Sequence, residues 1–284
     1  MPDQAEKLRE LVKKKKEIRV VSVASGKGGV GKTIIAVNLA IALSRLGVRV
    51  LVVDADFGLA NIDIMLGVTS KYNISHFLRG EKELHEIIQL GHEGVRFISG
   101  GSGINELLNM DEEQLAGVLG GLIQLDAPID FIIIDNGAGI NDNILQMILA
   151  SSETIIITTP EPTAILDAYA LVKTIMRRDE SYPMHLLVNK CDNKREAQRV
   201  QEGFIEVIGR HLGTSIDPLG LIMYDRDVPS SIKRQIPITV SAPDGGTAQS
   251  IYQISRSLID LPGEKTSDKF LSKIFYRMLG DRRG

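Results

Sequence analysis

Tryptophan is absent from the 284-residue chain, aromatic residues make up 5% of it, and Cys191 is its single cysteine. A lone cysteine excludes an intrachain disulfide scaffold and a cysteine-rich metal or iron–sulfur site within one chain. No uninterrupted apolar segment reaches the roughly 18–20 residues that a membrane-spanning helix needs. Residues 1–16 also lack the apolar region of a secretory signal. These absences predict a protein of the reducing, cytoplasmic compartment.

The charges of the chain are distributed unevenly, although the formal net charge is only −3. Residues 1–19 and residues 264–284 each carry a net charge of +3, so the body between them is acidic. Hydrophobic residues make up 43% of the chain, which excludes global disorder. Basic ends on an acidic body predict that the ends contact an anionic surface, with plain solvated tails as the alternative.

Short apolar segments alternate with longer segments of helical periodicity. The expected strands are residues 18–25, 49–54, 95–99, 131–135, 154–159, 185–189 and 219–223. The clearest expected helices are residues 33–46, 166–177 and 194–211. Nearly continuous apolar strands are typical of a parallel sheet that is covered on both faces. The pattern predicts an α/β fold with a doubly wound, mostly parallel sheet and helices on both faces, in one domain over 18–261.

Residues 26–33 read GKGGVGKT and fit the P-loop pattern G-x-x-x-x-G-K-[ST], between an expected strand and an expected helix. Glycines let backbone N–H groups turn inward toward an anion, and the helix N-terminus adds positive potential. Lys32 is expected to reach the β and γ phosphates, and the Thr33 hydroxyl to ligate Mg²⁺. The expected ATP-binding residues of this loop are Gly26, Lys27, Gly28, Gly29, Val30, Gly31, Lys32 and Thr33.

The additional lysine, Lys27, makes the loop similar to the deviant P-loop of the MinD/ParA family of ATPases, and the resemblance extends over most of 18–255. It implies that Lys27 reaches the nucleotide of a partner subunit. Asp54 and Asp56 resemble the first switch of that family, and residues 135–139 (DNGAG) resemble its second switch, with Asn136 in place of the usual Ser or Thr. Asn189 lies where the family places an adenine-reading asparagine.

The resemblance also implies a role for each carboxylate. Lys27, Lys32 and Asp56 are the expected catalytic residues, and Asp56 would orient the attacking water. Asp54 and Asp135 would hold Mg²⁺ through water. The alternative is that these carboxylates cap the helices that follow their strands, and that Asn189 only forms a turn. ATP or ADP with Mg²⁺ is the expected cofactor set.

The C-terminal residues 262–284 form an amphipathic pattern. At 100° per residue, six apolar side chains separate from the basic ones. The apolar set is Phe270, Leu271, Ile274, Phe275, Met278 and Leu279, and the basic face includes Lys273 and Arg277. This pattern predicts an interfacial helix on anionic lipid, as in the membrane-targeting tails of MinD-type ATPases. A helix packed on its own domain is the alternative.

Residues 1–17 are expected to form a short N-terminal helix that binds a partner. The stretch DQAEKLR resembles the activator motif of the FlhG (FleN) branch of the family, which regulates flagellar number and placement. The expected contact residues are Asp3, Gln4, Ala5, Leu8 and Arg9. The resemblance implies the GTPase FlhF and the flagellar switch proteins FliM, FliN and FliY as partners. A frayed, unused terminus is the alternative.

The sequence thus predicts a slow, dimer-activated Mg-dependent ATPase that binds the inner face of the cell membrane reversibly. A cell-division or partition ATPase of the MinD or ParA type stays open as an alternative, although the acidic body argues against strong DNA binding. A binding adaptor with a degenerate ATPase site is a further alternative. An iron–sulfur carrier is disfavoured because Cys191 has no second cysteine beside it.

Overall fold

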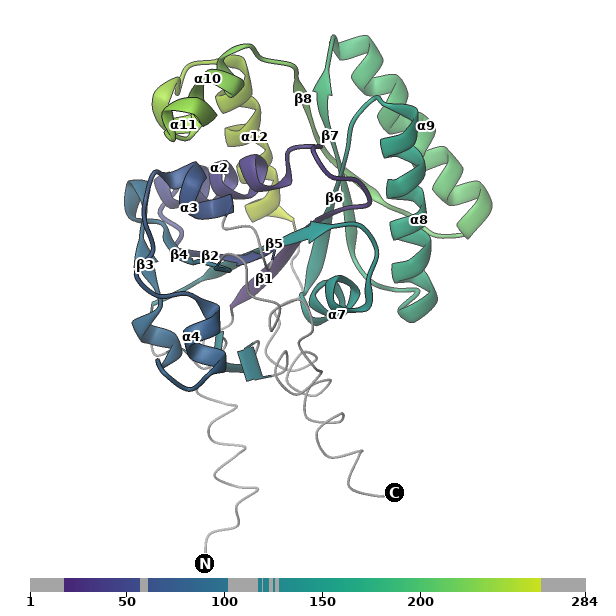
Figure 1. Cartoon of the computed structure of the whole chain (residues 1–284). Helices are drawn as coiled ribbons and strands as arrows, with labels where there is room; N and C mark the ends of the chain where they lie inside the picture. Colours follow the sequence, from purple (N-terminus) through teal and green to yellow (C-terminus); the bar gives the residue numbers. More distant parts are fainter. Residues whose placement is uncertain are drawn as a thin grey trace, which may run out of the picture.

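The structure is a computed structural model that describes residues 18–56, 61–101, 117–118, 120–122, 125 and 128–261. The expected N-terminal helix over 1–17 and the expected tail over 262–284 lie outside the described residues. The described part of the chain forms the α/β domain that the sequence predicts (Figure 1).

An eight-stranded sheet with the order β3-β4-β2-β5-β1-β6-β7-β8 forms the centre of the domain. The strands are β1 (Arg19–Ser25), β2 (Val50–Ala55), β3 (Gln89–Leu90), β4 (Arg96–Ile98), β5 (Phe131–Ala138), β6 (Glu153–Thr158), β7 (Met184–Cys191) and β8 (Asp217–Met223). All neighbouring pairs are parallel except β3–β4. The seven expected strands are confirmed. The edge strand β3 was not expected, because two residues carry no readable periodicity.

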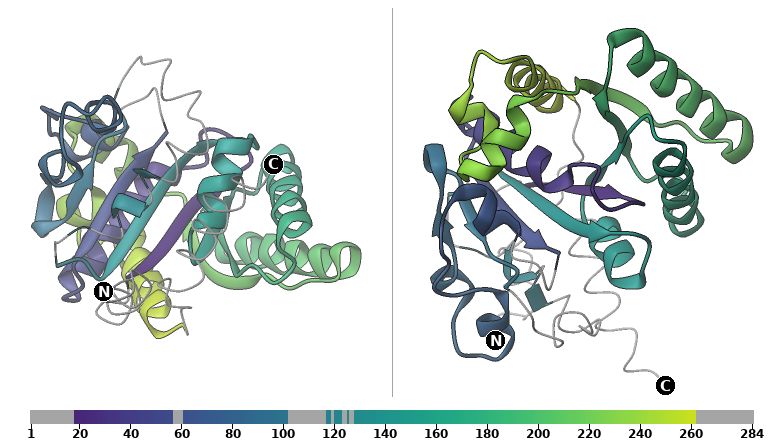
Figure 2. Two further views of the ribbon diagram at one scale, coloured as in Figure 1. Left: turned by 90° about the horizontal axis from the view of Figure 1, so that it is seen from below. Right: turned by 45° about the horizontal axis from the view of Figure 1, so that its top comes forward.

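Helices cover both faces of this sheet, as Figure 2 shows from two further directions. They are α2 (Lys32–Arg45), α3 (Asn61–Leu66), α4 (Ile74–Leu78), α7 (Asp142–Ala150), α8 (Pro162–Arg178), α9 (Lys194–Leu212), α10 (Asp227–Arg234), α11 (Ile238–Ser241) and α12 (Gly246–Asp260). Two 3₁₀ turns, η1 (Leu84–Glu86) and η2 (His92–Gly94), flank β3. Side chains of α2, α3, α11 and α12 share one hydrophobic core, whereas α7, α8 and α9 pack in a core with other sheet residues.

Helix α2 is the most deeply buried helix next to the expected nucleotide site. Its apolar residues from Ile35 to Leu43 are almost fully inaccessible to solvent. Helix α12 packs along it and approaches β8 closely, since a Cβ on Gly220 would lie 2.4 Å from Ile254. The P-loop helix is therefore held between the sheet and the last described helix.

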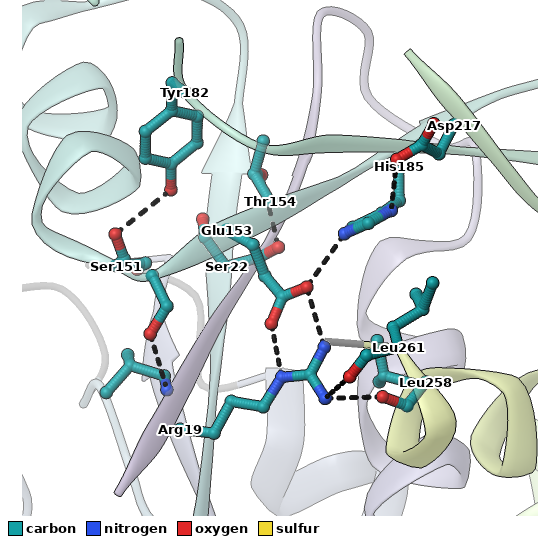
Figure 3. A network of polar contacts seen from close by, with 12 residues as sticks. Arg19, Ser22, Ser151, Glu153, Thr154, Tyr182, His185, Asp217, Leu258 and Leu261 are labelled. Carbon is teal, nitrogen blue, oxygen red and sulfur yellow. Dashed lines mark hydrogen bonds and ion pairs between the residues drawn. The ribbon is translucent and has the colours of Figure 1, made fainter. Parts of the chain in front are cut away.

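A buried polar network joins the two ends of the described chain (Figure 3). The Arg19 guanidinium pairs with the Glu153 carboxylate and donates to the carbonyl oxygens of Leu258 and Leu261 at the end of α12. Glu153 Oε2, which also accepts from Arg19, contacts His185 Nε2 at 2.8 Å. Because the last carbonyls of a helix lack intrahelical partners, Arg19 satisfies the oxygen of Leu258 in the last turn of α12.

Within the described ranges, no helix combines the length and apolar composition that a bilayer crossing requires.

Candidate functional site

The P-loop follows the central strand β1, at the point where the strand order changes direction between β5 and β6. Open α/β sheets bind ligands at such a point, beyond the carboxyl ends of the strands. Gly29 and Gly31 have φ angles of 78° and 99°, a backbone conformation that side chains with a Cβ adopt at a cost. The loop therefore has the left-handed turns of an anion-binding nest, and α2 begins directly after it.

Gly26 lets the loop pass close to α8. A Cβ on Gly26 would lie 2.2 Å from the backbone oxygen of Asp167, which is far inside van der Waals contact. Gly28 has no such constraint, because the nearest atom to an added Cβ is Ala138 Cβ at 3.8 Å. The first glycine of the motif is therefore needed for packing, in addition to the backbone freedom that the motif requires.

A buried cluster of charges lies beneath the loop. Lys32 is 8% exposed, and burial lowers the pKa of its ammonium group, while the charges of Asp135 and Asp56 act in the opposite direction. Burial raises the pKa of Asp135 to about 7, against the opposing effects of Thr33 and Lys32. Lys32, Thr33, Asp56 and Asp135 thus come together as the sequence predicts.

Asp54 and Asp135 are directly paired neighbours on β2 and β5. Asp54 Oδ1 accepts from the N–H of Asp56, and its Oδ2 accepts from the N–H groups of Asn61 and Ile62 at the start of α3. Burial, followed by the charge of Asp135, holds the pKa of Asp54 well above its usual range. The described contacts of Asp54 are those of a cap that organises the first switch. A role in holding Mg²⁺ through water stays a prediction.

Asp56 is positioned by a residue that the sequence did not indicate. The Asn61 side-chain amide donates to Asp56 Oδ2 at 2.9 Å. Asn61 comes from α3, five positions further along the chain, so only the folded loop reveals the contact. Gly137 of the second switch faces the same carboxylate, because an added Cβ there would lie 3.2 Å from Asp56 Oδ1.

Asn136 lies at an irregularity where β5 has one more residue than β1 between two register pairs. Its amide donates to Ser22 Oγ at 2.6 Å and to the backbone oxygen of Val23 at 3.0 Å. This side chain is 1% exposed, so it fills the interior of the sheet at the start of the second switch. β-bulges commonly re-aim the residues next to an active site. Asn136 anchors that bulge to β1.

Asn189 and Lys190 tie the end of β7 to the P-loop. Asn189 Nδ2 donates to the backbone oxygen of Val30 at 2.8 Å, and Lys190 Nζ donates to that of Gly29 at 2.7 Å. Lys190 has a φ of 58°, which is uncommon for a residue with a side chain. The amide expected to read the base is thus in contact with the phosphate loop.

Lys27 lies at the surface and contacts the start of α8. Its Nζ donates to Glu161 Oε2 at 2.7 Å and to Thr163 Oγ1 at 2.8 Å, both at the start of α8. The hydrogen bond from Lys27 lowers the pKa of Glu161. Sequence reasoning missed Glu161 and Thr163, because Lys27 lies 134 and 136 positions earlier and no spacing links them.

The site fits a Mg²⁺–nucleotide. Both carboxylate oxygens of Asp135 are buried, and neither has a hydrogen-bond partner among the described residues. A carboxylate oxygen beside Thr33 suits a water of the Mg²⁺ shell. In the described ranges, no group of three or more histidine, cysteine, aspartate or glutamate side chains is arranged to hold a metal ion by itself.

Comparisons with known proteins agree with this geometry. A family model described as ParA, NUBPL iron-transfer P-loop NTPase, matches residues 16–259. The antiactivator FleN of Pseudomonas aeruginosa is 32% identical over 245 residues, which cover 86% of this chain and 88% of that protein. The flagellum site-determining protein YlxH of Helicobacter pylori is 34% identical over 254 residues, covering 85% and 82%.

A solved structure with the same fold is MinD of Pyrococcus horikoshii complexed with Mg-ADP. It has a TM-score of 0.73 and 25% identity, and the match covers 89% of this chain and 99% of that one. This chain has no pair of cysteines that could bind iron as the iron-transfer description of the family implies, because Cys191 is its single cysteine and is fully buried. The family match, the relatives and the P-loop geometry together show that the chain belongs to the ParA/MinD family of P-loop NTPases.

Proposed function

We propose that the protein is an ATP-dependent dimerising Mg-ATPase that binds a membrane reversibly and regulates the number and placement of flagella. The observation that carries the dimerisation step is the position of Lys27. Its ammonium group lies on the surface beside the P-loop and contacts α8, so it is available to a nucleotide bound by a second subunit. Exposed ion pairs contribute only about 0–1 kcal/mol, so Lys27 leaves Glu161 at little cost.

Hydrolysis then uses the buried end of the site. The P-loop backbone and Lys32 bind the phosphates, and Asp56, held by Asn61, orients the attacking water. Lys27 of the second subunit neutralises charge that develops in the transition state. Mg²⁺ would supply electrostatic stabilisation of the phosphates when bound, and Thr33 would hold it directly, with Asp135 and Asp54 acting through water.

The C-terminal pattern supports the membrane step. An apolar face opposite a basic face favours binding to anionic lipid. A helix as short as residues 270–279 binds such a surface only weakly on its own. Two tails on one dimer bind far more strongly than one, because the second contact is intramolecular. ATP-dependent dimerisation would therefore place a cytoplasmic protein on the inner face of the cell membrane, and hydrolysis would release it.

The flagellar role rests on the relatives. FleN is named an antiactivator and YlxH a flagellum site-determining protein, and both match most of this chain. The N-terminal stretch with Gln4 supports contact with the GTPase FlhF, which it would stimulate. FliM, FliN and FliY are the proposed partners at the flagellar base.

A cell-division or partition role is the second candidate. The septum site-determining protein MinD of Bacillus subtilis is 28% identical over 243 residues, covering 84% of this chain. The stretch DQAEKLR before the first strand favours the flagellar role, because it resembles the activator motif of the FlhG branch.

Co-sedimentation with liposomes containing anionic lipid tests the proposal. We expect the protein to pellet with ATP and Mg²⁺ and to stay in solution with ADP, and truncation after residue 261 to abolish pelleting. Ile274→Asp on the apolar face should abolish it too. Tyr276→Asp adds the same charge on the opposite side and should keep most of the binding. Equal pelleting with ATP and with ADP would contradict the membrane switch, and so would pelleting of the truncated protein.

A further inference from the structure

Tyr224 is an exposed aromatic residue at the carboxyl end of β8, the strand that pairs with the strand of Asn189. It directly follows β8, and its residue is 57% exposed. Its backbone N–H donates to the oxygen of Cys191 at 2.8 Å. This bond continues the parallel pairing of β7 with β8 by one step beyond the pair Cys191–Met223. The backbone of Tyr224 is therefore held as an extension of the strand.

Strand periodicity determines the face on which the Tyr224 side chain lies. Ile222 packs in the core that contains α2, and Met223 packs against the core on the opposite face of the sheet. Because side chains alternate along a strand, Tyr224 lies on the α2 face. On the neighbouring strand, Asn189 is on that same face, since its amide contacts the P-loop oxygen of Val30.

The loop after Tyr224 is fixed by Asp225. This carboxylate accepts from the N–H of Asp227 and from the hydroxyl of Thr247, at 2.9 Å each. It thereby connects the starts of α10 and α12 to the end of β8. A bulky aromatic side chain thus projects from a rigid backbone at the ligand-binding edge of the sheet, where it contributes little to the core.

We propose that Tyr224 is a nucleotide-binding residue whose ring stacks on the purine base. The P-loop binds the phosphates, Asn189 lies at the edge of the base, and the Tyr224 ring covers one face. Aromatic rings stack on bases because both have polarisable π-faces, and such stacking tolerates different bases. This inference rests on the proposed nucleotide-binding function and adds a contact that neither the P-loop pattern nor the relatives assign.

Equilibrium binding of ATP, ADP and inorganic tripolyphosphate to the full chain and to three variants tests the inference. Tyr224→Ala should weaken ATP and ADP binding equally, by about tenfold or more. Tyr224→Phe keeps the ring and should bind both nucleotides within about twofold of the native protein. Tripolyphosphate has no base, so its affinity should be the same in all variants. Leu90→Ala is the matched control, because Leu90 is 66% exposed on the opposite edge strand β3.

The outcomes distinguish a failure of the proposed function from a failure of the stacking inference. A native protein that binds neither nucleotide contradicts the proposed function itself. If native ATP binding is present and Tyr224→Ala leaves it unchanged, only the stacking inference is overturned. A loss of tripolyphosphate affinity in Tyr224→Ala would also overturn it, since that result means a general change in the P-loop. Equal losses of ATP and ADP with tripolyphosphate unchanged support the stacking contact.

Discussion

The ammonium group of Lys27 and the carboxylate of Glu161 form an ion pair with an N–O distance of 2.7 Å, between the P-loop and the first turn of α8. The pair is at the surface, whereas Lys32, five positions later in the same loop, is buried beside Asp135. The two lysines of one short motif therefore differ in environment. In the proposed function they bind different nucleotides: Lys32 that of its own subunit, and Lys27 that of the partner.

Removing each lysine should separate these roles. Lys32→Ala should weaken ATP and ADP binding by about 10–100-fold, because a charged hydrogen bond to phosphate contributes about 1.5–3 kcal/mol. Lys27→Ala should leave the affinity of the monomer for ADP within about twofold, since its ammonium contacts α8. Calorimetric titration with Mg-ADP measures both. A large loss of ADP affinity in Lys27→Ala would show that this lysine serves its own site.

Asp56 and Asn61 should affect turnover to different extents. Asp56→Ala removes the group that orients water, so kcat should fall by at least about 10²-fold while ATP still binds. Asn61→Ala removes only the amide that holds Asp56 Oδ2, so we expect a smaller fall in kcat, about tenfold, with KM unchanged. Steady-state ATPase kinetics distinguish the two variants. Normal turnover in Asp56→Ala would contradict its assigned role.

Gly26 and Gly28 provide a matched pair within the loop. Gly26→Ala places a methyl group against the α8 backbone, and the resulting strain should cost about 1–3 kcal/mol of stability and reduce ATP affinity. Gly28→Ala has room for the methyl group and should change the free energy of unfolding by less than about 0.5 kcal/mol. Urea unfolding followed by circular dichroism tests both. Equal stability of the two variants would show that the loop does not depend on its contact with α8.

The Glu153 network should make stability depend on pH. Burial alone would raise the pKa of Glu153, but the hydrogen bonds from His185 and Arg19 outweigh it and lower that pKa below its ordinary value. A lowered pKa means that the ionised carboxylate stabilises the fold above the ordinary glutamate pKa of 4.5, and that this contribution is lost as the pH falls through the lowered value. Glu153→Gln should therefore cost about 3 kcal/mol near pH 7.

The cost of Glu153→Gln should shrink as the pH falls below 4.5. Glu180→Gln is the control, because Glu180 is exposed and should show no such dependence. Chemical unfolding at several pH values measures the difference. A constant cost of Glu153→Gln over the whole pH range would contradict the role of the ionised carboxylate.

The sequence predicted those parts of the site that depend on local spacing. The P-loop, the seven main strands and the carboxylates at strand ends follow from short patterns, and the structure brings Lys32, Thr33, Asp56 and Asp135 together. Asp54 was expected near Mg²⁺, and its described contacts are with backbone N–H groups of the first switch.

The remaining contacts connect residues that are distant along the chain or that lie on neighbouring loops. Glu161 contacts Lys27 only because α8 begins beside the P-loop, and the backbone of Tyr224 reaches Cys191 only because β8 pairs with β7. Asn61 reaches Asp56 through the fold of the first switch. No periodicity in a single sequence reports such contacts, so the residues that position the catalytic groups emerge only from the tertiary structure.

Light-scattering measurement of molar mass in solution tests the central claim most directly, with the native protein, Asp56→Ala and Lys27→Ala each in Mg-ATP and in Mg-ADP. The account predicts a dimer for the native protein and a longer-lived dimer for Asp56→Ala in ATP, and monomers for both in ADP. Lys27→Ala should stay monomeric with either nucleotide. A Lys27→Ala protein that dimerises with ATP, or a native protein whose mass is the same in ATP and ADP, would contradict the account.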